Sequence, residues 1–269
     1  MWIAAMVATG VALGAAFAGL ADAPASASAD RFDVVIIDAG HGGEDAGARG
    51  VDGTLEKTLV LEVSERLSAE IRRRGMAPIM TRAGDSYVPL EERMGIANDA
   101  RGDLFVSIHA NSARNAKVRG TEVFHRSLEA SDEAAEELAQ RENAAFGTPA
   151  VERSEHSDPV LAVLGRLIVD EYEKESGVFA KMAEARLREV GTLRSRGAKQ
   201  APFVVLTDVQ MPSALVEIGF ITNHKDVKVL RTRAVQEEIV NALADAVVEY
   251  GHRHDALRGI TAANGGESQ

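Results

Sequence analysis

The sequence predicts an α/β fold: a single domain with a central, mostly parallel mixed sheet, flanking helices and a helical insertion. Two observations carry this prediction. Short β-branched segments alternate along the chain with longer segments of helical periodicity, a pattern typical of parallel sheets layered with helices. Three polar residues, His41, His109 and Glu217, lie at or just after the ends of predicted strands, and chemistry in such folds gathers beyond the carboxyl ends of strands.

Strands and helices alternate in the first half of the chain. The clearest helix is predicted over residues 54–74, where Thr54 can cap the first turn, Arg72 to Arg74 suit the negative end of the helix dipole, and Gly75 ends the helix. A shorter helix is predicted over 90–100. The predicted strands, each short and apolar, cover 32–37, 77–80, 104–108 and 121–124.

The amino-acid composition changes between residues 127 and 190, where Glu, Ala, Leu and Arg dominate. This composition predicts two or three helices. Because this stretch lies between predicted strands, we interpret it as an insertion within the domain. Strands are then expected at 203–206 and 214–218, with a closing helix at 232–250. Residues 30–258 would form one catalytic domain, and the Gly-rich tail 259–269 is expected to be disordered.

The N-terminal segment differs from the rest of the chain. Residues 2–21 are almost all apolar, and Ala27-Ser28-Ala29 follows as a small-residue pattern typical of a cleavage site. We therefore predict that residues 1–29 are an export signal. The run is also long enough to remain as an N-terminal membrane anchor, and contact with a membrane is expected only in that case. Either alternative places the domain outside the cytoplasm.

Charge and composition exclude some classes of function. The net charge is −11, so the chain offers no basic field for a nucleic acid, and we expect no such partner. Cysteine is absent, which excludes disulfides and thiolate metal sites. Any metal ion must be held by His, Asp or Glu.

His41 lies in the segment DAGHGG, directly after a predicted strand. Glycines in such a loop can serve phosphate binding, but their spacing fits neither the dinucleotide nor the P-loop pattern. They also fit a tight turn that lets a metal ion approach His41 closely. Asp38 has two open interpretations, as an acceptor that orients His41 or as a turn residue.

Glu56 and His109 are the expected companions of His41. Glu56 shares a helix face with Val60 and Val63, where a carboxylate is costly unless it is paired or binds a metal; the alternative is a solvated Glu favoured by the helix dipole. His109 ends the strand in LFVSIHAN, where it is either a core histidine or a ligand. Two histidines and one carboxylate are typical of catalytic zinc sites.

Two further glutamates interrupt apolar patterns. Glu217 lies in the apolar strand of PSALVEIGFITN, where it is either an ion-paired core residue or a base that takes a proton from water and passes it to a leaving amine. Glu142 lies on a weak apolar stripe of the insertion, four residues after Leu138. The pattern alone favours a chance inward-facing Glu, although a carboxylate there could also reach a metal.

Four motifs in order (IIDAGHGGEDAGARG, TLEKTLVLEVSERL, LFVSIHAN and PSALVEIGFITN) resemble the zinc-dependent N-acetylmuramoyl-L-alanine amidases of bacterial cell walls, over roughly residues 34–250. The resemblance implies one zinc ion per chain, held by His41, Glu56 and His109, and a catalytic role for Glu217. It implies hydrolysis of the peptidoglycan amide that joins the lactyl group of N-acetylmuramic acid to L-alanine. It also implies a location in the periplasm or on the cell wall.

The segment LAQRENAA resembles the insertion of the cell-separation members of this family. In those members a helix covers the site and offers a glutamate to the zinc until an activator protein displaces it, so the resemblance assigns this inhibitory role to Glu142. The following residues, FGTPAVERSEHSD, depart from the apolar, Gly-rich run of the family. Two alternatives stay open: a zinc carboxypeptidase that holds a free carboxylate with Arg82 or Arg93, and a non-catalytic peptidoglycan-binding module.

Overall fold

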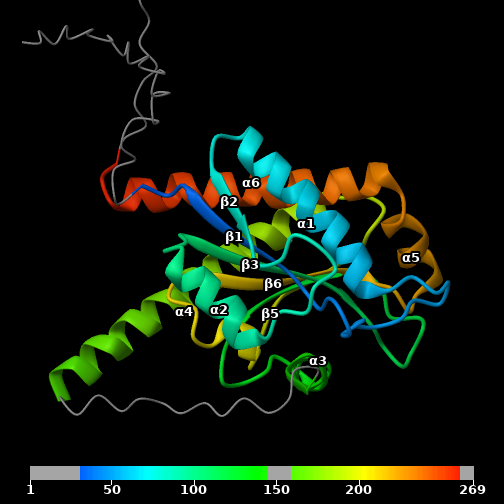
Figure 1. Ribbon diagram of the computed structural model, residues 1–269, viewed down its shortest axis with the longest axis horizontal. Coiled ribbons are helices and arrows are strands. Elements are labelled where there is room, and N and C mark those ends of the chain that lie inside the picture. The colour runs from blue at the N-terminus through cyan, green and yellow to red at the C-terminus, as the bar shows by residue number, and fades with distance from the viewer. Residues whose placement is uncertain (1–30, 145–158, 261–269) are drawn as a thin grey trace, which may run out of the picture. The chain divides into compact units, whose positions relative to one another are not determined.

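The computed structural model of the chain describes residues 31–144 and 159–260 (Figure 1). The predicted export signal, residues 1–29, and all but two residues of the predicted tail lie outside these ranges. Within them, no helix combines the length and apolar character that a membrane crossing requires.

A six-stranded sheet forms the centre of the domain, in the order β2-β1-β3-β6-β4-β5. All neighbouring strands are parallel except β4 and β6, which are antiparallel. The predicted fold class is therefore confirmed: a mixed, mostly parallel sheet with flanking helices. The strands are β1 Val34–Ala39, β2 Ala77–Met80, β3 Leu104–Asn111, β4 Thr121–Arg126, β5 Ser195–Ala201 and β6 Ser213–Phe220.

Helices cover both faces of the sheet and enclose two apolar clusters (Figure 1). The larger cluster joins the sheet to α1, α4 and α6, and the smaller one joins it to α2, α3 and the short turn of 3-10 helix η1. The helical elements are α1 Glu56–Arg73, α2 Leu90–Asp99, α3 Glu133–Ala144, α4 Pro159–Arg188, η1 Val204–Leu206, α5 His224–Leu230 and α6 Arg233–Leu257.

The predicted insertion, residues 127–190, divides into two parts with different packing. The C-terminal half of α4 belongs to the core, since Phe179, Ala183 and Leu187 are fully buried in the larger cluster. In α3, only Ala135, Leu138 and Ala139 are buried. Burial of one leucine contributes roughly 1.5–3 kcal/mol, so the apolar part of the contact between α3 and the sheet is small.

Three local predictions were wrong or incomplete. The segment 203–206, predicted as a strand, contains the 3-10 helix η1 instead. The strand of this region, β5, lies just before it and has the polar sequence SRGAKQA, which is tolerated because β5 is at the edge of the sheet. Thr54 does not cap α1: its N-cap residue is Leu55, which makes no side-chain cap bond. The short helix α5 was not predicted, although Asn223 caps it by accepting from the amides of Lys225 and Asp226.

Candidate metal centre and active site

Four of the five predicted site residues lie together at the carboxyl ends of the neighbouring strands β1, β3 and β6 and at the start of α1. His41 follows β1 by two residues, His109 lies near the end of β3, and Glu56 is the first residue of α1. Glu217 of β6 is directly paired with His109 across the parallel strands. The alternation of strands and helices therefore places these side chains together, as the carboxyl ends of parallel strands are expected to do.

Glycines around His41 allow close approach of backbone to side chain. A Cβ atom on Gly40 would lie 2.5 Å from the His109 ring, and one on Gly47 would lie 2.6 Å from the His41 ring. His41 itself has a φ of 58°, a left-handed conformation that is costly for a residue with a side chain. The glycines thus serve the tight turn that the sequence indicates.

The structure brings four ligand atoms together. His41 Nε2 lies 3.1 Å from Glu56 Oε1 and 3.3 Å from Glu142 Oε2. His109 Nδ1 lies at the same two distances, 3.1 Å and 3.3 Å, from the same two oxygens. A tetrahedral ion with bonds of roughly 2.0–2.1 Å separates its ligand atoms by roughly 3.3–3.4 Å. The residues therefore fit a small divalent cation such as zinc.

The charges of this cluster also fit a divalent cation. Burial alone would lower the pKa of His109, but the hydrogen bond and charge of Glu142, followed by those of Glu56, raise it to about 10. Burial would also lower the pKa of His41, but the charge of Glu56 and the hydrogen bonds to Asp45, Glu142 and Glu56 together raise it. The two carboxylates thus favour the protonated form of both imidazoles, which adds a charge of +2 to the cluster. A divalent cation carries the same charge and can take the place of the two protons.

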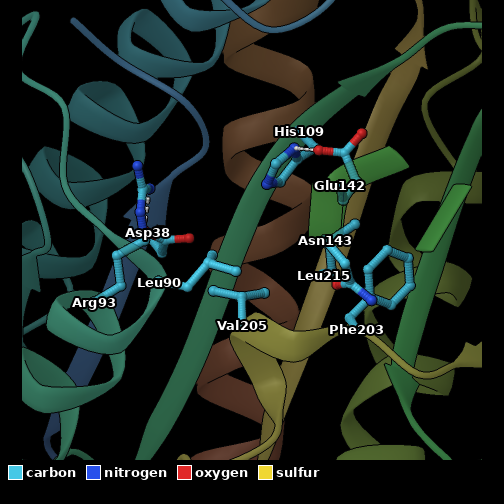
Figure 2. A pocket seen from close by; sticks show the side chains of 9 residues that line it. All are labelled: Asp38, Leu90, Arg93, His109, Glu142, Asn143, Phe203, Val205 and Leu215. Atoms are coloured by element: carbon cyan, nitrogen blue, oxygen red, sulfur yellow. Dashed lines mark hydrogen bonds and ion pairs between the residues drawn. The ribbon is translucent and has the colours of Figure 1, made fainter. Parts of the chain in front are cut away.

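Glu142 enters the cluster from α3, on the side opposite α1. Its carboxylate points toward His109 (Figure 2), and the neighbouring Asn143 fixes the end of the helix by donating to the Pro202 carbonyl and accepting from the Val204 amide. A cavity lined by His109, Glu142 and apolar residues that include Phe203 and Leu215 has a volume of about 10 Å³. This volume holds about one water molecule. With α3 in this position, this cavity is too small for a peptide substrate.

Asp45, which the sequence analysis missed, holds His41. Its Oδ2 accepts from His41 Nδ1 at 2.7 Å and its Oδ1 accepts from the Gly47 amide. Such an acceptor fixes the orientation of an imidazole ligand. Asp38, for which the sequence left two interpretations open, accepts instead from Thr81 and Ser107 and pairs with Arg93. These contacts do not support the interpretation in which it orients His41.

Arg82 and Arg93 are committed to the protein backbone. Arg93 is fully buried and donates to the carbonyls of Ala39 and His41. Arg82 donates to the carbonyls of Ala39 and Gly40. The two guanidinium groups therefore stabilise the turn that carries His41. This arrangement disfavours Arg82 and Arg93 as the side chains that would hold a substrate carboxylate in the carboxypeptidase alternative.

Glu217 is a buried acid whose loss of hydration is not offset by hydrogen bonds from the described residues. It is fully buried, and neither of its oxygens has a hydrogen-bond partner within the described ranges. Burial, reinforced by the negative charges of Glu56 and Glu142, raises its pKa well above the ordinary value, although His109 acts in the opposite direction. A buried acid with a raised pKa beside a candidate metal cluster is typical of a proton-transfer residue.

The comparisons with known proteins agree with this geometry. The family model described as N-acetylmuramoyl-L-alanine amidase matches residues 35–249. The N-acetylmuramoyl-L-alanine amidase AmiA of Escherichia coli is 37% identical over 223 residues, covering 82% of this chain and 77% of that protein. The amidase AmiC of Escherichia coli is 35% identical, over 84% of this chain and 55% of that protein.

Solved structures show the same fold. The amidase AmiC2 of Nostoc punctiforme superimposes with a TM-score of 0.63 at 29% identity, covering 82% of this chain and 98% of that one. The catalytic domain of CwlV from Bacillus (Paenibacillus) polymyxa gives a TM-score of 0.62 at 24% identity, covering 81% of this chain and 97% of that one. Because the family model matches most of the chain, this protein belongs to the N-acetylmuramoyl-L-alanine amidase family of hydrolases.

Proposed function

We propose that this protein is a zinc-dependent peptidoglycan amidase that cleaves the amide between the lactyl group of N-acetylmuramic acid and L-alanine. The observation that carries the proposal is the convergence of His41, Glu56 and His109, with the buried acid Glu217 on the strand paired with that of His109. These three ligands would hold one zinc ion per chain. A bound zinc ion supplies Lewis acidity, which polarises a carbonyl group and lowers the pKa of water.

In this proposal Glu217 performs the proton transfers. Its carboxylate takes a proton from the attacking water as the new C–O bond forms at the lactyl carbonyl. The same proton then passes to the alanine nitrogen as the C–N bond breaks, so the stem peptide leaves with a neutral amino group. Burial suits the task because a base with a raised pKa accepts a proton more readily.

We further propose that α3 inhibits the enzyme. Catalytic zinc sites keep one position open for water or substrate, and the Glu142 carboxylate lies where that position would be. An activator protein that binds preferentially to the uncovered state would shift the population toward it. The small apolar contact of α3 with the sheet suits a helix that is displaced during activation.

The location follows from the sequence and the family together. We propose that residues 1–29 export the protein, as a cleaved signal or an anchor, and that the domain acts on the wall during cell separation. Peptidoglycan is the expected substrate.

Product analysis of digested peptidoglycan tests the proposed reaction. An amidase exposes the amino group of alanine and leaves the lactyl group of the sugar bare, and a chelator should stop this release. A carboxypeptidase would instead release single residues from the peptide end. Binding to sacculi without turnover, even with activator, would support the non-catalytic alternative and contradict the proposal.

A further inference from the structure

A row of polar side chains extends from the candidate site across the sheet. Glu217 is paired with His109 of β3 on one side and with Glu122 of β4 on the other. Directly paired residues point to the same face of a sheet, so these three side chains lie in one row. On the next strand, β5, Arg196 and Lys199 both donate to Glu122 Oε1, at 2.9 Å and 2.8 Å.

The row ends at Arg196 and Lys199, which both pair with the buried carboxylate of Glu122. Lys199 also pairs with Asp132, which lies 3.0 Å away and immediately precedes α3. Arg196 also lies over the Phe220 ring at the end of β6, 5.5 Å from its centroid. Among Arg196, Lys199 and Glu122, one positive charge has no carboxylate partner unless Asp132 is in place.

The covering helix contacts the same row at a second point. Arg141 of α3 donates to Asn111 Oδ1 at 3.1 Å, and the Asn111 amide donates to Glu122 Oε2 at 3.1 Å. Displacement of α3 would remove Arg141 and Glu142 from the row, and a displacement that extends to the residue before the helix would also remove Asp132. Lys199 would then keep its bond to Glu122 and have donors to spare, because an ammonium group carries three.

We propose that Lys199 and Arg196 form a subsite for a carboxylate on the peptide part of the substrate, and that Asp132 occupies this subsite while α3 covers the site. This proposal rests on the proposed amidase function. The ligand of this subsite is an acidic peptide. In the covered state two carboxylates take the positions of substrate groups: Glu142 lies at the metal position, and Asp132 lies where the peptide carboxylate would bind.

The spacing suits an extended peptide. Strand β5 lies two strand spacings from β6, which is roughly 10 Å, while an extended chain advances roughly 3.3–3.6 Å per residue. A peptide that starts at the scissile amide beside Glu217 and crosses β4 would therefore bring a carboxylate to Lys199 two or three residues along. The net charge of −11 over the whole chain disfavours acidic ligands, so a local positive site is needed to hold one.

The test compares two soluble muramoyl peptides that differ only in their peptide carboxyl groups, free in one and converted to carboxamides in the other. The enzyme is the full chain with Glu142→Ala, which removes the carboxylate from the metal position and leaves Asp132 in place. We expect kcat/KM to favour the free acid by about tenfold, the effect of one charge-assisted hydrogen bond. Lys199→Met in this background should remove the preference by raising KM for the free acid, while Lys174→Met, at an exposed ion pair on α4, should leave it intact.

A second variant keeps the test independent of folding defects at Lys199. Asp132 caps α3 by accepting from the Ala135 amide. Asp132→Asn preserves this cap, since asparagine caps as well as aspartate, and removes the competing carboxylate. It should lower KM for the free acid and leave that for the carboxamide unchanged. Equal kcat/KM for both substrates in the Glu142→Ala protein, or an equal loss for both in Lys199→Met, would overturn the subsite.

Equilibrium binding separates failure of the subsite from failure of the amidase function. If no variant cleaves either muramoyl peptide, the proposed function is wrong. Calorimetric titration of the same two peptides into the Glu142→Ala protein then still decides the subsite. Tighter binding of the free acid, abolished by Lys199→Met, supports it, and equal binding of both peptides contradicts it.

Discussion

Glu217 and His109 are directly paired in the neighbouring parallel strands β6 and β3, and both are buried. The strand pairing sets the separation of these two side chains, so the candidate base and a candidate metal ligand are held on rigid elements. Rigid placement of reacting groups is a large part of enzymatic rate enhancement. The remaining candidate ligands come from a loop and two helix ends, which depend on local contacts.

Replacement of the candidate base should stop the reaction without releasing the metal. We expect Glu217→Gln to lose about 10²–10⁴ in kcat, the usual contribution of general acid–base catalysis, and to keep its metal content. Release of stem peptide from purified sacculi measures the loss. Glu137→Gln, on the exposed side of α3, is the matched control. Near wild-type release by Glu217→Gln would refute the assignment.

The buried acid should also reduce stability at neutral pH. In metal-free protein, Glu217 keeps a proton above pH 4.5, where the unfolded chain has released it. Each pH unit above that value then costs the folded state up to about 1.4 kcal/mol. Glu217→Gln should therefore stabilise the chelated protein more at pH 7 than at pH 4.5, as measured by urea unfolding. A pH-independent difference would contradict the raised pKa.

Removal of the covering carboxylate should activate the enzyme. Glu142→Ala breaks the contacts of α3 with both imidazoles, and we expect basal release to rise on the order of tenfold or more. Glu137→Ala, on the same helix but exposed, should have no effect. Unchanged basal release in Glu142→Ala would reduce α3 to a structural covering.

The buried pair of Asp38 and Arg93 should make folding sensitive to acid. Burial alone would raise the pKa of Asp38, but Arg93 and the hydroxyl groups of Ser107 and Thr81 hold it below the ordinary value of 3.8. The stabilisation is complete above that value and is lost as the pH falls through the lowered pKa. Asp38→Asn should cost roughly 3 kcal/mol at pH 7, a difference that shrinks below pH 4. An equal cost at pH 3 and pH 7, measured by urea unfolding, would contradict this.

The sequence predicted the residues that interrupt an apolar pattern. His41, Glu56, His109 and Glu217 each follow or lie within a strand or helix face that is otherwise apolar, and the structure brings the first three together with Glu142. Strand and helix periodicity marked these residues as candidates, while their roles as ligands and base were implied by the family resemblance. Glu142 could not be predicted from pattern, since its position depends on how α3 docks.

Other features depend on contacts that periodicity does not record. Asp45 holds His41 through the conformation of a loop, and Arg93 acts through backbone carbonyls that any residue carries. Strand β5 is polar because it lies at the sheet edge and carries Arg196 and Lys199. A search for acidic residues four positions from the loop histidine would have found Asp45.

Metal content of the purified full-length protein tests the central claim most directly. We expect elemental analysis to find about one zinc ion per chain, and we expect His41→Ala and His109→Ala each to lose it while the fold, followed by circular dichroism, is retained. A folded wild-type protein that contains no divalent ion and takes up none on titration would contradict the assignment of this cluster as a metal centre.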